Sequence, residues 1–233
     1  LDSWLDNNIA TDAPALYSDF GPVTIERSTI TNHESDNATL RLSNVEPVRI
    51  ENSTITNNRS QHAILFFTSD GATTIQNATI TNNAAPTTIL NPLVLYSTVG
   101  LRNSVLFNSA TERECVGVTS LGHNACPPGD EGACSFSSTT DIIVTDPLLD
   151  ALARNGGKTL ARMPLVGSPL RDAGDDANCP VLDQRIADRP QDGDGDGVAH
   201  CDIGAVEAPE PDGLALPAAL TALALQARRR LRL

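Results

Sequence analysis

A gapless repeat runs through the first half of the chain and constrains its fold more than any other feature of the sequence. Four segments, which begin at Ile25, Ile50, Ile75 and Leu101, align at offsets of 25, 25 and 26 residues. Within each coil, short stretches such as Val23-Thr-Ile25 and Val48-Arg-Ile50 alternate apolar with polar residues, which is the pattern of a β-strand. Such a strand buries its apolar face only when the next coil stacks on it, so the repeat predicts a parallel β-solenoid.

The register of the repeat predicts which side chains point into the solenoid. Stacking equivalent positions gives three inward ladders: Val23/Val48/Thr73/Val99, Ile25/Ile50/Ile75/Leu101 and Ile30/Ile55/Ile80/Leu106. A fourth ladder consists of Asn32, Asn57, Asn82 and Asn108, for which we expect left-handed turns and carboxamides bonded to one another and to backbone. We predict an all-β chain: a right-handed parallel β-helix with about 25 residues per coil, an irregular C-terminal cap and an apolar tail.

Composition and charge narrow the class of protein. The formal net charge of −13 disfavours nucleic acid as a partner. Five cysteines lie in the second half, and their clustering favours an oxidising compartment. Because the sequence starts at Leu1 inside a repeat, we expect it to be the C-terminal part of a longer exported protein, with further coils and a signal peptide upstream.

The sequence changes character after the repeats and becomes rich in Gly, Pro and Asp. We expect coils over residues 1–120, a disulfide-bearing cap over 121–207 and a C-terminal tail over 208–233. The last coil of a solenoid exposes strand edges and core side chains, so a segment that covers that end is the simplest reason for the change.

Eight phrases of this second half carry a family resemblance. They are Ser120–Asn124, Asp146–Leu149, Asn155–Gly157, Gly167–Pro169, Asp172–Gly174, Asp183–Arg185, Asp192–Gly197 and Cys201–Glu207. In this order they resemble the choice-of-anchor Q domain proteins, which are bacterial surface proteins with a parallel β-helix. The resemblance covers nearly the whole chain, implies a location in the cell envelope and implies no particular reaction.

An acidic loop begins at Asp192 and is the candidate metal site. Asp192, Asp194 and Asp196, followed by glycine, match the opening of a calcium loop, because alternating carboxylates converge on a hard cation. The twelfth position is Ile203 instead of glutamate, so Asp202 or Glu207 is the candidate for the last ligand. The alternative is a solvated acidic turn that holds no ion.

Two disulfides are predicted in the same half. Cys179 and Cys201 flank the glycine-rich acidic loop, which needs an outside constraint because ordering glycines costs backbone entropy. Cys115 and Cys134 are paired as a second bridge, although Cys126 competes for either partner.

The C-terminal tail resembles a PEP-CTERM sorting signal, which exosortase-type enzymes of Gram-negative bacteria recognise. Its motif Pro209-Glu210-Pro211 precedes a short apolar stretch and the basic cluster Arg228, Arg229 and Arg230. The resemblance implies a sorting enzyme as a partner and a cell-surface or matrix location. The alternative is an amphipathic tail that lies on a membrane through its arginines.

Two functions are considered for the outward positions on the first strand of each coil. Glu26, Arg49, Glu51 and Arg102 share one outer face, which is either a carbohydrate-binding cleft or a solvated, salt-bridged surface. The first function is a non-catalytic exported β-helix protein that binds extracellular polysaccharide. The alternative is a polysaccharide lyase or glycoside hydrolase on the same fold, with its site on this face or in upstream coils.

Overall fold

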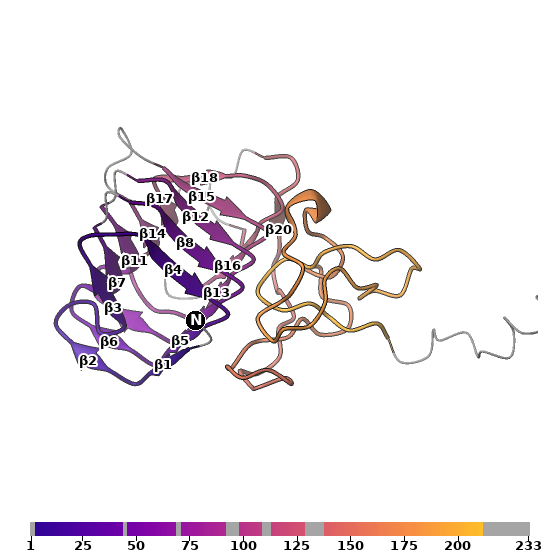
Figure 1. The fold of residues 1–233 in the computed structure, drawn as a ribbon, viewed down its shortest axis with the longest axis horizontal. Coiled ribbons are helices and arrows are strands. Elements are labelled where there is room, and N and C mark those ends of the chain that lie inside the picture. Colours follow the sequence, from indigo (N-terminus) through magenta and orange to yellow (C-terminus); the bar gives the residue numbers. More distant parts are fainter. Residues whose placement is uncertain are drawn as a thin grey trace, which may run out of the picture.

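The structure, a computed structural model, describes residues 3–43, 46–68, 71–91, 98–108, 113–128 and 138–211. It is a β-solenoid of parallel strands with an irregular C-terminal segment, residues 145–208, packed against one side (Figure 1). Among these residues the one helical element is a short 3₁₀ helix, Asp176–Asn178, and no helix is long and apolar enough to cross a membrane. The predicted parallel β-helix is therefore confirmed.

Four parallel sheets run along the solenoid. The longest has the order β1 (Trp4–Asp6), β5 (Thr29–Thr31), β9 (Thr54–Thr56), β13 (Thr79–Thr81), β16 (Val105–Phe107), β19 (Ala125–Cys126) and β20 (Ile142–Ile143). A short sheet contains β2 (Ile9–Ala10), β6 (Glu34–Ser35) and β10 (Arg59–Ser60). The third contains β3 (Leu16–Ser18), β7 (Ala38–Leu42), β11 (Ala63–Phe67), β14 (Thr87–Leu90) and β17 (Arg113–Val116). The fourth contains β4 (Val23–Glu26), β8 (Val48–Glu51), β12 (Thr73–Gln76), β15 (Val99–Arg102) and β18 (Val118–Ser120).

The register of the coils is the one predicted from the repeat. Ile25, Ile50, Ile75 and Leu101 pair in sequence across β4, β8, β12 and β15. The ladders that begin at Val23 and Ile30 are also in register, and the latter extends back to Leu5 in β1. The buried members of these ladders form the core together with residues of the third sheet, such as Leu40, Leu65 and Ile89.

Each coil turns at residues with left-handed backbone on both sides of the central three-residue strand. Before that strand, Arg27, Asn52, Asn77 and Asn103 have φ between 46° and 47°. After it, Asn32, Asn57 and Asn82 have φ between 57° and 60°, as predicted. Asparagine adopts this conformation more readily than most residues with a side chain, which accounts for its recurrence at both corners.

The interior asparagine ladder is shifted by one residue from the prediction. Asn32, Asn57 and Asn82 are exposed, and the buried ladder is His33, Asn58, Asn83 and Asn108. The backbone N–H of each member donates to the next carboxamide oxygen, at 3.0 Å for Asn58 and 2.7 Å for Asn83. Each asparagine Nδ2 also donates to a buried carbonyl, and Glu114 accepts the last backbone N–H. The left-handed residue turns its own side chain outward, so its successor points inward.

The C-terminal segment lies along the side of the solenoid, whereas the sequence suggested that it covers the end of the last coil. It packs on the outer face of β5, β9, β13 and β16, and Val105 of that face joins an apolar cluster with Leu170 and Ile203. Gly204 approaches most closely: a Cβ there would lie 2.9 Å from Thr79 Oγ1. The outward threonines of the central strands are consequently buried.

The ladder predicts a sharp contrast between two adjacent asparagines. Asn83→Ala leaves the buried backbone N–H of Asn58 without its acceptor and removes the side-chain donor to Ile55 O, so the free energy of unfolding falls by about 2 kcal/mol. Asn82→Gly keeps the left-handed backbone at an exposed site and changes it by no more than about 0.5 kcal/mol. Urea titration of the two variants checks this. Equal losses would contradict the ladder.

Candidate functional site

The outer face predicted as a carbohydrate site is assembled, but its charges are paired. Glu26 and Glu51 are neighbours in register across β4 and β8. Arg27 forms an ion pair with Glu26, and Arg49 forms one with Glu51. Glu51 is buried, with 6% of the residue exposed. Neither carboxylate is presented to solvent as a bare base.

The C-terminal segment covers the other end of this face. Arg102 lies 3.8 Å from the Asp175 carboxylate, and the Gln76 side chain donates to Asn178 O. The Asn103 side chain accepts the backbone N–H of Asp175 at 2.8 Å. The predicted face is therefore a salt-bridged surface that lies partly beneath the C-terminal segment. Its residues are Glu26, Arg49, Glu51 and Arg102.

Gln184 and Ala205 join the segment to three successive coils. Its Nε2 donates to Ser28 O and Thr159 Oγ1, and its Oε1 accepts from Thr54 Oγ1 at 2.6 Å. Ala205 N donates to Thr79 Oγ1 at 3.0 Å. These bonds satisfy the row of buried threonine hydroxyls, which would otherwise be costly to bury.

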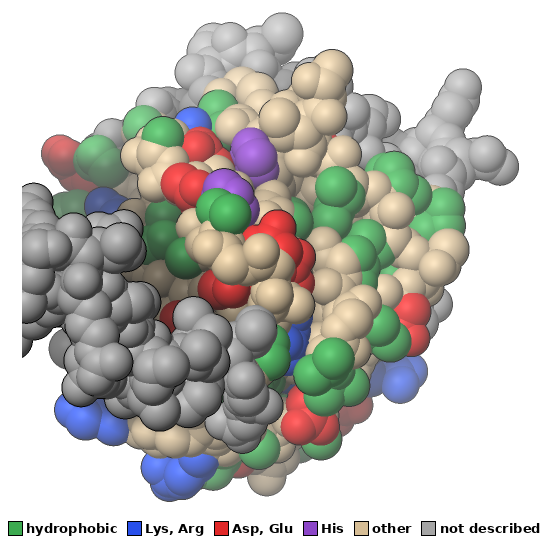
Figure 2. Space-filling view, turned by 90° about the vertical axis from the view of Figure 1, so that its right-hand side faces the viewer, with side chains coloured by type: hydrophobic (Ala, Val, Ile, Leu, Met, Phe, Trp, Pro, Cys, Tyr) green, Lys and Arg blue, Asp and Glu red, His purple; other side chains and the backbone are tan. Residues whose placement is uncertain are grey.

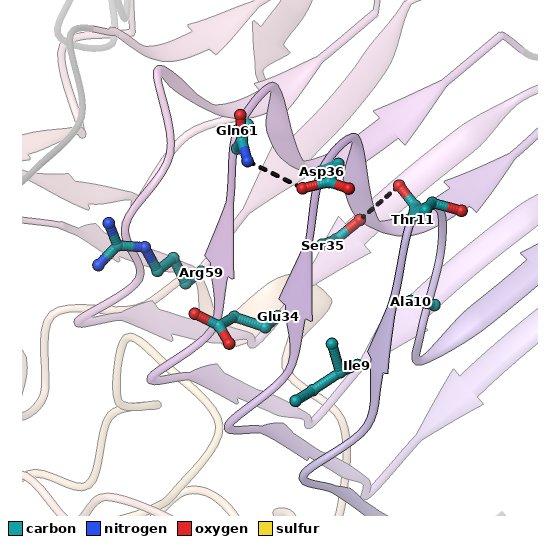
Figure 3. A pocket seen from close by; sticks show the side chains of 8 residues that line it. All are labelled: Ile9, Ala10, Thr11, Glu34, Ser35, Asp36, Arg59 and Gln61. Carbon is teal, nitrogen blue, oxygen red and sulfur yellow. Dashed lines mark hydrogen bonds between the residues drawn. The ribbon is translucent and has the colours of Figure 1, made fainter.

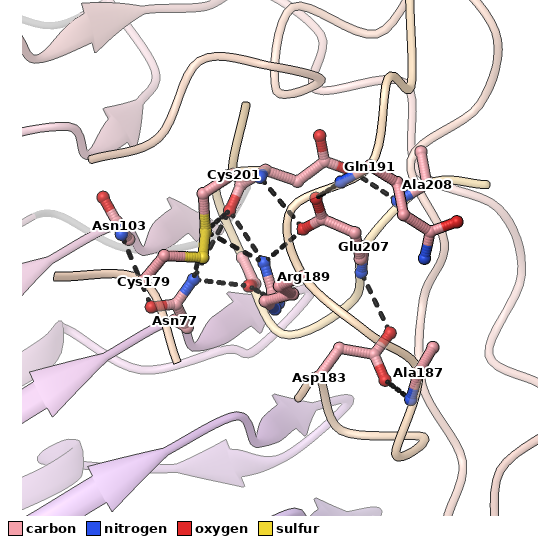
Figure 4. Close-up of polar contacts among 12 residues, drawn as sticks. Asn77, Asn103, Cys179, Asp183, Ala187, Arg189, Gln191, Cys201, Glu207 and Ala208 are labelled. Carbon is pink, nitrogen blue, oxygen red and sulfur yellow. Dashed lines mark hydrogen bonds and ion pairs between the residues drawn. A yellow bond between two sulfur atoms is a disulfide. The ribbon is translucent and has the colours of Figure 1, made fainter. Parts of the chain in front are cut away.

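A buried ionic group holds the segment together beside the predicted disulfide. Cys179 and Cys201 are bonded, with their Cα atoms 6.1 Å apart, which confirms that bridge. The Arg189 side chain is wholly buried and binds the Glu207 carboxylate at 2.7 Å and Gly204 O at 2.8 Å (Figure 4). Close packing around the bridge requires glycine at 174, because a Cβ there would lie 2.5 Å from Cys201 O.

The buried carboxylates of this group have raised pKa values. Burial, reinforced by the charge of Glu207, raises the pKa of Asp202 to about 7. Burial also raises the pKa of Glu207, although Arg189 opposes that shift. The Asp202 oxygens accept the backbone N–H groups of Asp172 and Ala208 at 2.7 Å and 2.5 Å. Asp202 is therefore a structural acceptor inside the segment.

The acidic loop brings together a different set of carboxylates from the predicted one. Asp192 and Asp194 lie with Asp172 so that one oxygen from each is within 4.8 Å of the others. This group contains neither Asp196, whose carboxylate accepts Val198 N, nor the buried Asp202. Asp172 lies twenty residues before the loop in sequence, so no spacing pattern pointed to it. Backbone N–H groups donate to all three carboxylates.

Acidic side chains and histidines gather on one face of the molecule (Figure 2). His200 Nδ1 lies 2.6 Å from the Asp176 carboxylate, and His123 Nδ1 lies 2.8 Å from Ala173 O. Hydrogen bonding to Asp176 raises the pKa of His200. Asp176 also accepts the backbone N–H of Cys201, so this exposed pair is tied to the disulfide.

The remaining predicted residues are placed only in part. Cys115 is in β17 and Cys126 is buried in β19, whereas Cys134 lies outside the described residues, so the second bridge stays a prediction. Pro209 and Glu210 are exposed and Pro211 is half-buried. Arg228, Arg229 and Arg230 also lie outside the described residues.

Sequence reasoning missed a groove of about 470 Å³ on the outer face of the short sheet (Figure 3). One wall is the in-register row Ile9, Glu34 and Arg59. The other is Thr11, Asp36 and Gln61, and Ala10 and Ser35 lie between them. Glu34/Arg59 and Asp36/Gln61 recur at the 25-residue offset, and that was the available signal.

No family model, no curated protein and no solved structure matches this chain.

Proposed function

We propose that the chain belongs to a non-catalytic, exported β-solenoid protein of the bacterial cell surface or extracellular matrix, where it meets polysaccharide. The observation that carries the proposal is the Cys179–Cys201 bridge. It lies at the junction with the solenoid, where Asn77 Nδ2 is 3.7 Å from Cys201 Sγ and 3.4 Å from Asp202 O. Disulfides persist in oxidising compartments, so a bridge that organises the segment favours export.

The pairing of the carboxylates on the predicted face supports a non-catalytic role. A glycoside hydrolase needs two carboxyl groups that flank its substrate, one of them protonated. Glu26 and Glu51 are instead paired with the adjacent arginines, and Asp202, with its raised pKa, is enclosed by backbone donors. The lyase or hydrolase alternative therefore draws no support from these residues.

The C-terminal motif supports a surface location. The choice-of-anchor Q resemblance implies a bacterial cell envelope, and the PEP-CTERM-like order of motif, apolar stretch and arginines implies a sorting enzyme of Gram-negative bacteria. Pro209-Glu210-Pro211 directly follows the buried run that ends at Ala208, so the motif is the first part of the chain to leave the folded segment. That position suits recognition by a sorting enzyme.

Removing the tail tests the location. The chain, fused behind a secretion signal peptide, is expressed in a Gram-negative bacterium that makes extracellular polysaccharide, with and without residues 209–233. The intact protein fractionates with the envelope, and the deletion variant moves to the periplasm or medium because the sorting motif is gone. Asp188→Ala, an exposed change outside the tail, is the control. Unchanged fractionation of the deletion variant would rule out sorting by this tail.

We further propose that calcium binds at the acidic loop through Asp172, Asp192 and Asp194. Three converging carboxylates suit a hard cation, and an ion between them relieves their mutual repulsion. At a calcium concentration about a hundred times the dissociation constant, the free energy of unfolding rises by about 2.7 kcal/mol.

Melting curves with calcium and with chelator measure this effect. Asp194→Asn removes a ligand charge and should abolish most of the difference, whereas Asp188→Asn, in the same segment, should keep it. A chelator-insensitive melting temperature in the unmodified protein would remove the ion from the proposal.

A further inference from the structure

The groove on the outer face of β2, β6 and β10 has two parallel walls that follow the axis of the stack. Ile9, Glu34 and Arg59 come from three successive coils. Neighbouring coils lie about 4.8 Å apart, so equivalent side chains recur at that step along the groove. An extended polymer that lies along the stack would meet one side chain from each wall per coil.

The polar groups of the groove are arranged as donor and acceptor pairs. Gln61 Nε2 donates to Asp36 Oδ1 at 2.8 Å across adjacent coils, which holds both groups in place. Glu34 and Arg59 are neighbours in register on the other wall, and both are exposed. Carboxylates accept from hydroxyl groups, and guanidinium and amide groups donate to them, so vicinal hydroxyls find both partners here.

The rest of the lining suits a saccharide as well. Ile9, with 76% of the residue exposed, offers an apolar surface to the C–H face of a sugar ring. Ser35 and Ala10 are small and leave the floor open between the walls (Figure 3). Because the lining sits on paired strands, little freedom is lost when a ligand binds.

The negative charge of the groove and of the chain favours an uncharged polymer over an acidic one. Glu34 and Asp36 outnumber Arg59 in the groove, and the chain as a whole carries a formal charge of −13. A uronate-bearing polymer would be repelled by that field. The field would attract a polycation anywhere on the surface, and the attraction would fade with added salt.

We propose that this groove is a binding site for an uncharged polysaccharide that lies along the solenoid axis across β2, β6 and β10. The inference deepens the proposed function and rests on it for the compartment in which polysaccharide is met. It moves the binding site from the face of Glu26, Arg49, Glu51 and Arg102 to the short sheet, which the central strands separate from that face.

Affinity electrophoresis of the purified chain tests the site. Native gels contain dextran, galactomannan or xyloglucan as neutral polymers, and alginate as the uronate polymer. At least one neutral polymer should retard the protein, with no dependence on salt, and alginate should not. Asp36→Ala and Gln61→Ala should each weaken the retardation about tenfold, because each removes a hydrogen-bonding group of one wall.

The controls separate binding from folding and from the surface charge. Asp188→Ala removes the same charge outside the groove and should bind as the unmodified chain does. Equal melting temperatures confirm that the groove variants fold. Absence of retardation by all three neutral polymers, retardation by alginate alone, or retardation that survives both groove variants would overturn the inference.

The same gels distinguish this inference from the proposed function. The polymer recovered after incubation is sized by chromatography. Binding with an unchanged polymer supports both proposals, whereas a shortened polymer would overturn the non-catalytic function and leave the binding site standing. If the protein fractionates with the envelope but no neutral polymer retards it, the proposed binding site is wrong and the proposed function stands.

Discussion

The structure depends on the satisfaction of polar groups inside a narrow stack. Each coil contributes a buried carboxamide to a chain of bonds that begins at His33 and ends on Glu114. Burial of these carboxamides without partners would be costly, whereas in register each one bonds to the next coil. The isoleucine and valine ladders then fill the remaining interior. A slip of one coil by one residue would break both systems together, so the register is strongly specified.

The same requirement accounts for the position of the C-terminal segment. The central strands carry threonines on their outer side, on both flanks of the inward isoleucine, and the hydroxyls of Thr29, Thr54 and Thr79 bond to residues 160, 184 and 205. That face is built to be covered. The bridge, the buried Arg189 and the close glycine contacts compensate for the lack of regular structure in the segment.

The parts of this account that repeat in sequence could be predicted, and the parts that occur once could not. The inward isoleucines, the left-handed asparagines and the coil length all follow from the 25-residue period. Asn108 was assigned to the wrong ladder because a gapless alignment pairs it with Asn82, whereas its side chain bonds to Asn83. The contact between Thr54 and Gln184 spans 130 residues and has no local signal.

In the candidate sites, too, local features could be predicted from the sequence, whereas long-range contacts could not. Cys179 and Cys201 could be paired because they flank one loop, while Asp172 joins that loop only through the fold. The predicted outer face is real, but its carboxylates and arginines neutralise one another. The groove on the short sheet repeats donors and acceptors at the same 25-residue offset, and we propose that it gives the stack a surface for a long, uncharged ligand.

Amide hydrogen exchange along the chain tests the central claim, that stacked coils and the docked segment form one polar-satisfied unit. We expect the amides of Asn58 and Asn83, which donate to buried carboxamides, to exchange among the slowest. We also expect comparable protection at Ala205, whose N–H donates to Thr79 across the interface. Rapid exchange at Asn58 and Asn83 would contradict the ladder. Rapid exchange at Ala205 beside protected coils would contradict the docking of the segment.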